Sequence, residues 1–148
     1  MNILFVCTGN TCRSPMAEAI LKSYHIEGLQ VKSAGVFASS GQAASKHVIT
    51  ILNNNNISHQ HSSSPLQKDD IHWATYIFTM TEGHKQLITA SYPDAIEKTF
   101  TLKEYVDHGA NNRDISDPFG GDEAIYEQTY QEISALIKKL VESLKDEK

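Results

Sequence analysis

The sequence has few cysteines and no long apolar run. Only two of its 148 residues are cysteines, Cys7 and Cys12, and both lie in one short segment. This excludes a scaffold of structural disulfides and favours the reducing cytoplasm. No apolar run approaches the ~20 residues of a membrane-spanning helix, and no charged, apolar, small-residue signal opens the chain. We therefore expect a cytoplasmic protein without a membrane segment.

The charge excludes two further classes of partner. The formal net charge is −5, from 13 Lys and Arg against 18 Asp and Glu, and the basic residues are scattered along the chain. This balance argues against nucleic acid and against an anionic membrane surface as partners. The four prolines and eight glycines form no linker. A chain of this length suits one domain with its own core, so we expect a single domain over residues 1–148 that acts as a monomer.

Apolar patterns predict strands and helices in alternation. Strands are expected at residues 3–6, 29–33, 74–80 and 98–102, and helices at 15–25, 44–52, 66–73, 82–92 and 125–144. Strands alternating with helices predict a parallel sheet with right-handed crossovers and helices on both faces, an α/β fold. Residues 57–65 and 105–117 lack periodicity and are expected to be loops.

Local signals suggest where two helices begin. Ser14 is a candidate N-cap, with Pro15 in the first helical turn, where its missing N–H is tolerated. Thr81 is a second candidate N-cap, and its helix is expected to bury Leu87 and Ile88.

The loop after the first strand, residues 7–14, is where we expect chemistry. Its backbone N–H groups and the following helix N-terminus can converge on a phosphate-sized dianion. Arg13 can bind two phosphate oxygens as a bidentate donor. Cys7, in the positive field of these amides, is expected to be a thiolate near neutral pH. Together these residues describe a nucleophile aimed at phosphorus.

Three more residues of the loop fit such an anion cradle. Gly9 permits a positive φ, and Asn10 tolerates the left-handed region while its side chain can bind the loop to itself. The Ser14 hydroxyl can donate to the sulfur of Cys7 and so favour the thiolate. The alternative is a buried cysteine in an ordinary turn between a strand and a helix, which this context disfavours.

The loop resembles the active-site loop of the low-molecular-weight protein tyrosine phosphatase family, whose pattern is Cys, any residue, Gly-Asn, any residue, Cys-Arg-Ser. Its fixed positions are matched by Cys7, Gly9, Asn10, Cys12, Arg13 and Ser14. The family also uses an Asp-Pro in a late loop, and Asp117-Pro118 stands just before the last expected helix. The resemblance spans nearly the whole chain and implies a single-domain, flavodoxin-like sheet of four parallel strands.

The resemblance implies a double displacement that needs no metal or other cofactor. Cys7 attacks phosphorus while the loop amides and the Arg13 guanidinium bind the equatorial oxygens. Asp117 protonates the leaving group and then acts as base when water hydrolyses the cysteinyl-phosphate. The substrate-binding residues that it implies are Thr8, Gly9, Asn10, Thr11, Cys12, Ser14 and Phe119.

Variable positions of the pattern indicate the substrate. Thr11 stands where tyrosine-directed members usually carry an apolar β-branched residue, and Phe119-Gly120 replaces the paired tyrosines that commonly follow their Asp-Pro. A phosphorylated guanidinium is flat and rich in N–H donors, which Thr11 and Asp117 can accept while Phe119 stacks on its plane. Residues 7–19, 33–39, 100–106 and 117–121 look like the protein arginine phosphatase branch, which acts on phosphoarginine in proteins. We therefore predict that activity, on phosphorylated protein substrates.

Three other functions remain open at this point. A tyrosine phosphatase of the same family is the nearest alternative. Arsenate reductases share a similar loop but need a further pair of cysteines, and no cysteine follows Cys12. A non-catalytic phosphate-binding module would keep the cradle but has no use for a thiol at Cys7 or an acid at Asp117.

Lesser signals give one hypothesis and several plain interpretations. A disulfide between Cys7 and Cys12 would protect the nucleophile from irreversible oxidation. His59 and His61 alternate in a polar loop, but no third ligand follows at a recognisable spacing, so no metal site is predicted. His84, Tyr126 and Tyr130 are interpreted as packing or surface residues.

Overall fold

The computed structural model describes residues 1–109 and 111–146. Four parallel strands form one sheet in the order β2-β1-β3-β4. The strands are β1 (Asn2–Cys7), β2 (Gln30–Gly35), β3 (Tyr76–Thr79) and β4 (Thr99–Thr101). The predicted four-stranded parallel sheet of an α/β fold is therefore confirmed.

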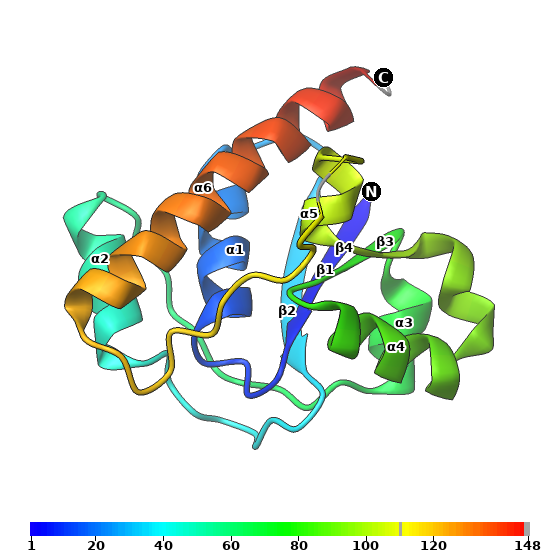
Figure 1. Cartoon of the computed structure of the whole chain (residues 1–148), viewed down its shortest axis with the longest axis horizontal. Helices are drawn as coiled ribbons and strands as arrows, with labels where there is room; N and C mark the ends of the chain where they lie inside the picture. The colour runs from blue at the N-terminus through cyan, green and yellow to red at the C-terminus, as the bar shows by residue number, and fades with distance from the viewer. Residues whose placement is uncertain (110, 147–148) are drawn as a thin grey trace.

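Helices cover both faces of this sheet (Figure 1). They are α1 (Arg13–Lys22), α2 (Lys46–Asn54), α3 (Lys68–Trp73), α4 (Glu82–Ser91), the 3₁₀ helix η1 (Pro93–Lys98), α5 (Leu102–Val106) and α6 (Glu123–Asp146). No helix in the described part of the chain is long and apolar enough to cross a membrane.

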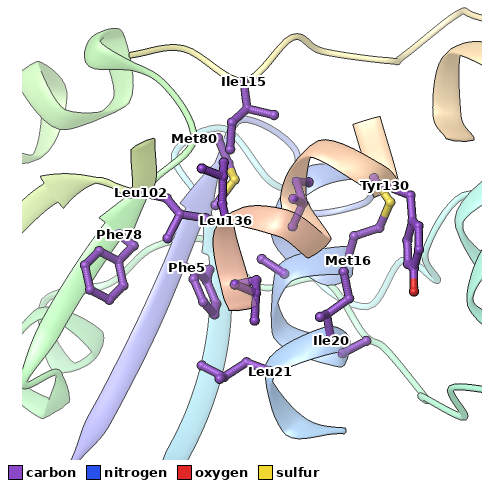
Figure 2. Packing of buried hydrophobic residues seen from close by; sticks show 14 of the residues in the cluster. Phe5, Met16, Ile20, Leu21, Phe78, Met80, Leu102, Ile115, Tyr130 and Leu136 are labelled. Atoms are coloured by element: carbon purple, nitrogen blue, oxygen red, sulfur yellow. The ribbon is translucent and has the colours of Figure 1, made fainter. Parts of the chain in front are cut away.

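The central strand β1 separates two hydrophobic clusters, because alternate side chains of a strand point to opposite faces. Ile3, Phe5 and Cys7 pack on the side of α1, α2 and α6. Leu4 and Val6 pack on the side of α3, α4 and η1. Figure 2 shows the first cluster, with residues such as Phe5, Met16 and Leu136 gathered beside the sheet. The strand is buried on both faces, which explains its unbroken apolar run.

The first helix begins two residues earlier than predicted. The backbone N–H of Met16 already donates to the carbonyl of Cys12, so the helix starts at Arg13 with Cys12 at the N-cap and no side-chain cap. The prediction of Ser14 as N-cap is wrong, because its hydroxyl faces back into the loop, where Cys7 and Asn10 contact it.

The fourth helix confirms one prediction and corrects another. The Thr81 hydroxyl caps α4 by accepting from the backbone N–H of His84 at 3.1 Å. Ile88 is buried as expected, but Leu87 is 45% exposed. The second buried residue of this helix is His84, one turn before Ile88. A polar side chain in the core-facing position is invisible to a search for apolar periodicity.

A short helix begins where the fourth strand was expected to end and runs into the expected loop. Thr101 and Glu104 form a capping box, each side chain bonded to the other's backbone N–H at 3.0 Å and 2.8 Å. This helix, α5, takes in Leu102 to Val106 and leaves a strand of only three residues before it. Tyr126 and Tyr130 are buried in α6, so their interpretation as helix packing is confirmed.

Candidate active site

A cavity of about 310 Å³ opens at the carboxyl edge of the sheet, where β1 ends in Cys7. In parallel sheets this is the edge where ligands bind. Three segments form it: the loop after β1, the segment after β2, and the loop before α6. Its lining residues are Cys7, Thr8, Gly9, Thr11, Cys12, Arg13, Phe37, Ser39, Gln42, Asp117 and Phe119.

Asn10 holds the loop after β1 in its curled shape. Its φ of 57° is left-handed, as predicted, and the residue is fully buried. Its side-chain oxygen accepts from the backbone N–H of Ser64 at 2.9 Å, which fixes the orientation of the amide. The amide nitrogen then donates to the hydroxyls of Ser14 and Ser33, each at 2.9 Å.

This arrangement places the Ser14 hydroxyl against the Cys7 sulfur. The Ser14 oxygen lies 2.8 Å from the Cys7 sulfur and already accepts from Asn10. When Cys7 is a thiolate, its sulfur can only accept, and the Ser14 hydroxyl donates its one proton to it. The predicted donor role of Ser14 has a geometric basis in this chain of bonds.

The protonation of Cys7 is set by opposing effects. Burial raises the pKa of its thiol, and hydrogen bonds from Ser14 and from the backbone of Asn10, together with the Arg13 charge, lower it. Burial is the largest of these causes and the net direction is upward. The prediction of a thiolate near neutral pH is wrong in this respect, because the sequence did not reveal how completely the sulfur is enclosed.

The glycine that the loop requires is a different one from the glycine predicted. Among the described residues the glycines with positive φ are Gly28, Gly41 and Gly120, so the prediction for Gly9 is wrong. At Gly35 a Cβ atom would lie 2.4 Å from the carbonyl oxygen of Thr8. The end of β2 thus needs glycine so that the catalytic loop can pack directly against its backbone.

Arg13 connects the loop to a segment far away in the sequence. Its side chain is 6% exposed, and one guanidinium nitrogen donates to the carbonyl of Ile115 at 2.8 Å. The other terminal nitrogen lies 3.6 Å from the Asp117 carboxylate, which is 51% exposed. Ile115 is itself fixed, since its N–H donates to the carbonyl of Met80 at 2.8 Å. The predicted pair of Arg13 and Asp117 is therefore brought together.

The rim of the cavity carries two aromatic rings and Thr11. Phe119 is 77% exposed and Phe37 is 74% exposed, and both line the cavity. The backbone N–H of Phe119 donates to Asp117 at 3.0 Å, which leaves the second carboxylate oxygen toward Arg13. Phe37 was not predicted as a site residue, although it lies in the stretch 33–39 that carries part of the family resemblance.

His84 is a residue near the site that sequence reasoning missed. It is buried, with its Nε2 2.8 Å from the Thr8 hydroxyl and its Nδ1 3.0 Å from the Thr81 hydroxyl. Burial and the Arg13 charge lower the pKa of His84 to about 4. The ring is therefore neutral at neutral pH and supports the start of the catalytic loop from the β3 side.

Cys12 is buried beside Tyr126, with 3.4 Å between its sulfur and the phenol oxygen. Both cysteines are free thiols, so the protective disulfide stays a hypothesis. Among the described residues, the group that could hold a metal ion is Glu18, His59 and His61, and none of the three lines this cavity.

A buried thiol at the end of the first strand, a curled amide loop and a buried guanidinium define a cysteine-dependent phosphatase site. The family model for "Low molecular weight phosphotyrosine protein phosphatase" matches residues 2–148, and the chain belongs to this family.

Relatives with assigned names fall into two groups. A protein-arginine-phosphatase of Geobacillus stearothermophilus is 49% identical over 145 residues, which is 98% of this chain and 97% of the relative. A solved structure of the YwlE arginine phosphatase from Geobacillus stearothermophilus is 49% identical to this chain, with a TM-score of 0.95 over 99% of this chain and 94% of that one. The low molecular weight protein-tyrosine-phosphatase PtpB of Staphylococcus epidermidis is 41% identical over 140 residues, 95% of this chain and 96% of the relative.

One further solved structure bears on the nucleophile. It is a YwlE arginine phosphatase, an active-site cysteine-to-serine variant whose serine is phosphorylated. It is 44% identical to this chain, with a TM-score of 0.92 over 98% of this chain and 96% of that one.

Proposed function

We propose that this protein is a protein-arginine phosphatase, which hydrolyses phosphoarginine in protein substrates through a cysteinyl-phosphate. The observation that carries the proposal is the meeting of Cys7, Thr11 and Asp117 in one cavity beside a buried guanidinium. The full-length similarity to proteins named as arginine phosphatases supports it.

The reaction begins with the phosphoryl group in the curled loop. The amides of residues 8–13 and the Arg13 guanidinium bind its equatorial oxygens, which supplies the positive potential that the transition state needs. Because burial raises the pKa of Cys7, we place the loss of its proton at substrate entry, when a phosphate oxygen takes that proton. Ser14 and Arg13 then stabilise the thiolate.

Two displacements follow. The Cys7 sulfur forms a bond to phosphorus as the bond from phosphorus to the guanidino nitrogen breaks, and Asp117 gives its proton to that nitrogen. Water then attacks the cysteinyl-phosphate with Asp117 as base, which releases phosphate and the thiolate. The phosphorylated serine in the cysteine-to-serine relative supports a covalent intermediate at this position. No metal or cofactor takes part in this scheme.

The rim residues favour a guanidinium over a phenyl ring. The Thr11 hydroxyl and the Asp117 carboxylate both line the cavity and offer acceptors to the N–H groups of a phosphoarginine. The ring of Phe119, which is 77% exposed, is available to stack on the guanidinium plane.

A tyrosine phosphatase is the second candidate, and one observation favours it. Phe37 and Phe119 stand at the same cavity mouth, where two aromatic rings could flank a phosphotyrosine ring. The relatives named PtpB also carry the tyrosine phosphatase name.

Replacement of Thr11 distinguishes the arginine phosphatase from the tyrosine phosphatase. We expect Thr11→Ile to lower kcat/KM for a phosphoarginine peptide and to raise it for a phosphotyrosine peptide, because the acceptor is replaced by an apolar wall. The experiment measures phosphate release from both peptides by both proteins. An unchanged ratio of the two kcat/KM values would remove Thr11 from the account of specificity.

A further inference from the structure

Glu18 of α1 and two histidines of the segment after α2 form a buried cluster away from the catalytic cavity. Each of Glu18, His59 and His61 offers one ligand atom, and these atoms lie within 4.8 Å of one another. Their side chains are only 10%, 8% and 4% exposed. The sequence hid the cluster because some forty residues separate the carboxylate from the histidines.

A hydrogen bond to the loop after β1 shows which nitrogen of His61 is the donor. Nε2 lies 2.6 Å from the backbone carbonyl oxygen of Asn10. A carbonyl only accepts, so Nε2 is the donor, and Nδ1 is the ring nitrogen left toward Glu18. Nδ1 lies 3.9 Å from a carboxylate oxygen of Glu18.

A second histidine nitrogen, from His59, faces the same carboxylate. Its Nε2 is buried, has no hydrogen-bond partner among the described residues and lies 3.8 Å from the other carboxylate oxygen of Glu18. A buried polar atom without a partner is costly, so its position calls for an explanation.

The ammonium group of Lys22 contacts only one oxygen of the Glu18 carboxylate. Lys22 places its ammonium 2.5 Å from Glu18 Oε2, and its side chain is 46% exposed, so it can move into solvent. Ser33 donates to the other oxygen. Neither of these bonds involves Nε2 of His59 or Nδ1 of His61.

We propose that Glu18, His59 and His61 bind a divalent transition metal ion, of which Zn²⁺ is the best match. Two imidazole nitrogens with one carboxylate oxygen form a common three-residue zinc set, with bonds of about 2.0–2.2 Å. In a tetrahedron of such bonds the ligand atoms are about 3.4 Å apart, so side-chain shifts of less than about 1 Å suffice. The proposal of a metal site does not rest on the proposed phosphatase activity.

The metal would act on the catalytic loop through one hydrogen bond. A cation on Nδ1 of His61 makes its Nε2–H a stronger donor to the Asn10 carbonyl, the type of outer contact that orients metal-binding histidines. Asn10 is the left-handed residue that holds the loop in shape. The ion therefore acts as a stabilising contact for the anion cradle.

Zn²⁺ titration by calorimetry tests the proposal, in the Cys7→Ser protein so that the nucleophile cannot bind the metal. We expect one ion per chain with a dissociation constant of micromolar order or lower. His59→Gln in the same background should weaken binding at least about tenfold. His72→Gln, at an exposed position of α3, is the matched control and should bind as the parent does.

A second variant keeps all three ligands and does not depend on folding of a mutated site. Lys22→Gln removes the competing ammonium, and we expect Zn²⁺ to bind about threefold more tightly or better. Zn²⁺ should also raise the melting temperature of the parent and not that of His59→Gln. Absence of binding, equal affinity in His59→Gln, or an unchanged affinity in Lys22→Gln would each overturn the site. Detection by NMR of a proton on both nitrogens of His61 in the presence of Zn²⁺ would do so as well.

Discussion

Asp117 lies 3.6 Å from Arg13, with its other carboxylate oxygen bonded to the backbone of Phe119. Arg13 is in turn fixed by the carbonyl of Ile115. In the proposed mechanism, the guanidinium that binds phosphate thus also positions the acid that serves the leaving group. One buried side chain joins the loop after β1 to the loop before α6.

Replacement of this acid should affect the chemical step more than binding. We expect Asp117→Asn to lower kcat by about 10²–10⁴-fold, because proton transfer to the leaving group is lost while the loop that binds phosphate is intact. Competitive inhibition by inorganic phosphate measures the loop, and its inhibition constant should change little. Asp69→Asn, at an exposed position of α3, is the control. Equal loss in both variants, or an undiminished kcat, would contradict the role of Asp117.

Loss of the Ser14 hydroxyl should raise the pKa of Cys7 further. The hydrogen bond from Ser14 favours the charged form of the sulfur, so its removal in Ser14→Ala shifts the titration upward by about one pH unit. The rate of iodoacetamide alkylation against pH measures this, with mass mapping to separate Cys7 from Cys12. Ser23→Ala, whose hydroxyl bonds only the end of the same helix, should titrate as wild type does. A titration midpoint at or below that of wild type would contradict the direction of donation.

His84 makes stability depend on pH in one direction. Burial and the Arg13 charge lower its pKa from 6.5 to about 4. The unfolded chain takes up this proton near pH 6.5 and the folded chain only near pH 4, so a falling pH favours unfolding across that window. Wild type should lose about 1–2 kcal/mol of unfolding free energy between pH 6.5 and 4, after allowance for solvent near the ring.

The variant His84→Gln should lose less over the same window, because glutamine does not titrate. Urea unfolding at pH 7.5, 5.5 and 4.5 gives the comparison, and His72→Gln serves as the exposed control. Parallel loss of stability in wild type and His84→Gln would show that His84 titrates normally.

A methyl group at Gly35 should distort the catalytic loop. The added carbon would meet the Thr8 carbonyl at 2.4 Å and the backbone nitrogen of Asn10 at 3.0 Å, so the cradle has to move. We expect Gly35→Ala to lower kcat/KM at least about tenfold and to reduce stability by roughly 1–3 kcal/mol. At Gly83 the nearest contact of a methyl group would be 3.6 Å, and Gly83→Ala should keep wild-type kcat/KM. Equal kcat/KM in the two variants would show that the close approach is unimportant.

The sequence predicted the reactive residues of the site better than the residues that surround and support them. Cys7, Arg13 and Asp117 carry reactive groups in a recognisable order, so a pattern could find them, and the structure places them together. Alternating strands and helices likewise predicted the sheet. Burial depends on contacts between distant segments, and the enclosure of Cys7, which raises its pKa, could not be predicted from its neighbours in the chain.

Polar residues that support a site from a distance were missed for the same reason. His84 and Glu18 lie in ordinary helical segments, and each gains its significance from a partner on another element. In the sequence Gly35 stands out only within residues 33–39, which carry part of the resemblance, although the tight packing of Thr8 against it is what requires glycine. Local patterns predict which element a residue belongs to, and the packing of elements decides what that residue touches.

The most direct test of the account is the ratio of kcat/KM on phosphoarginine and phosphotyrosine peptides of equal sequence context, with Cys7→Ser as the blank. We predict that wild type prefers the phosphoarginine peptide and that Cys7→Ser releases phosphate from neither. A preference for the phosphotyrosine peptide would contradict the proposed specificity, and phosphate release by Cys7→Ser would contradict the cysteinyl-phosphate route itself.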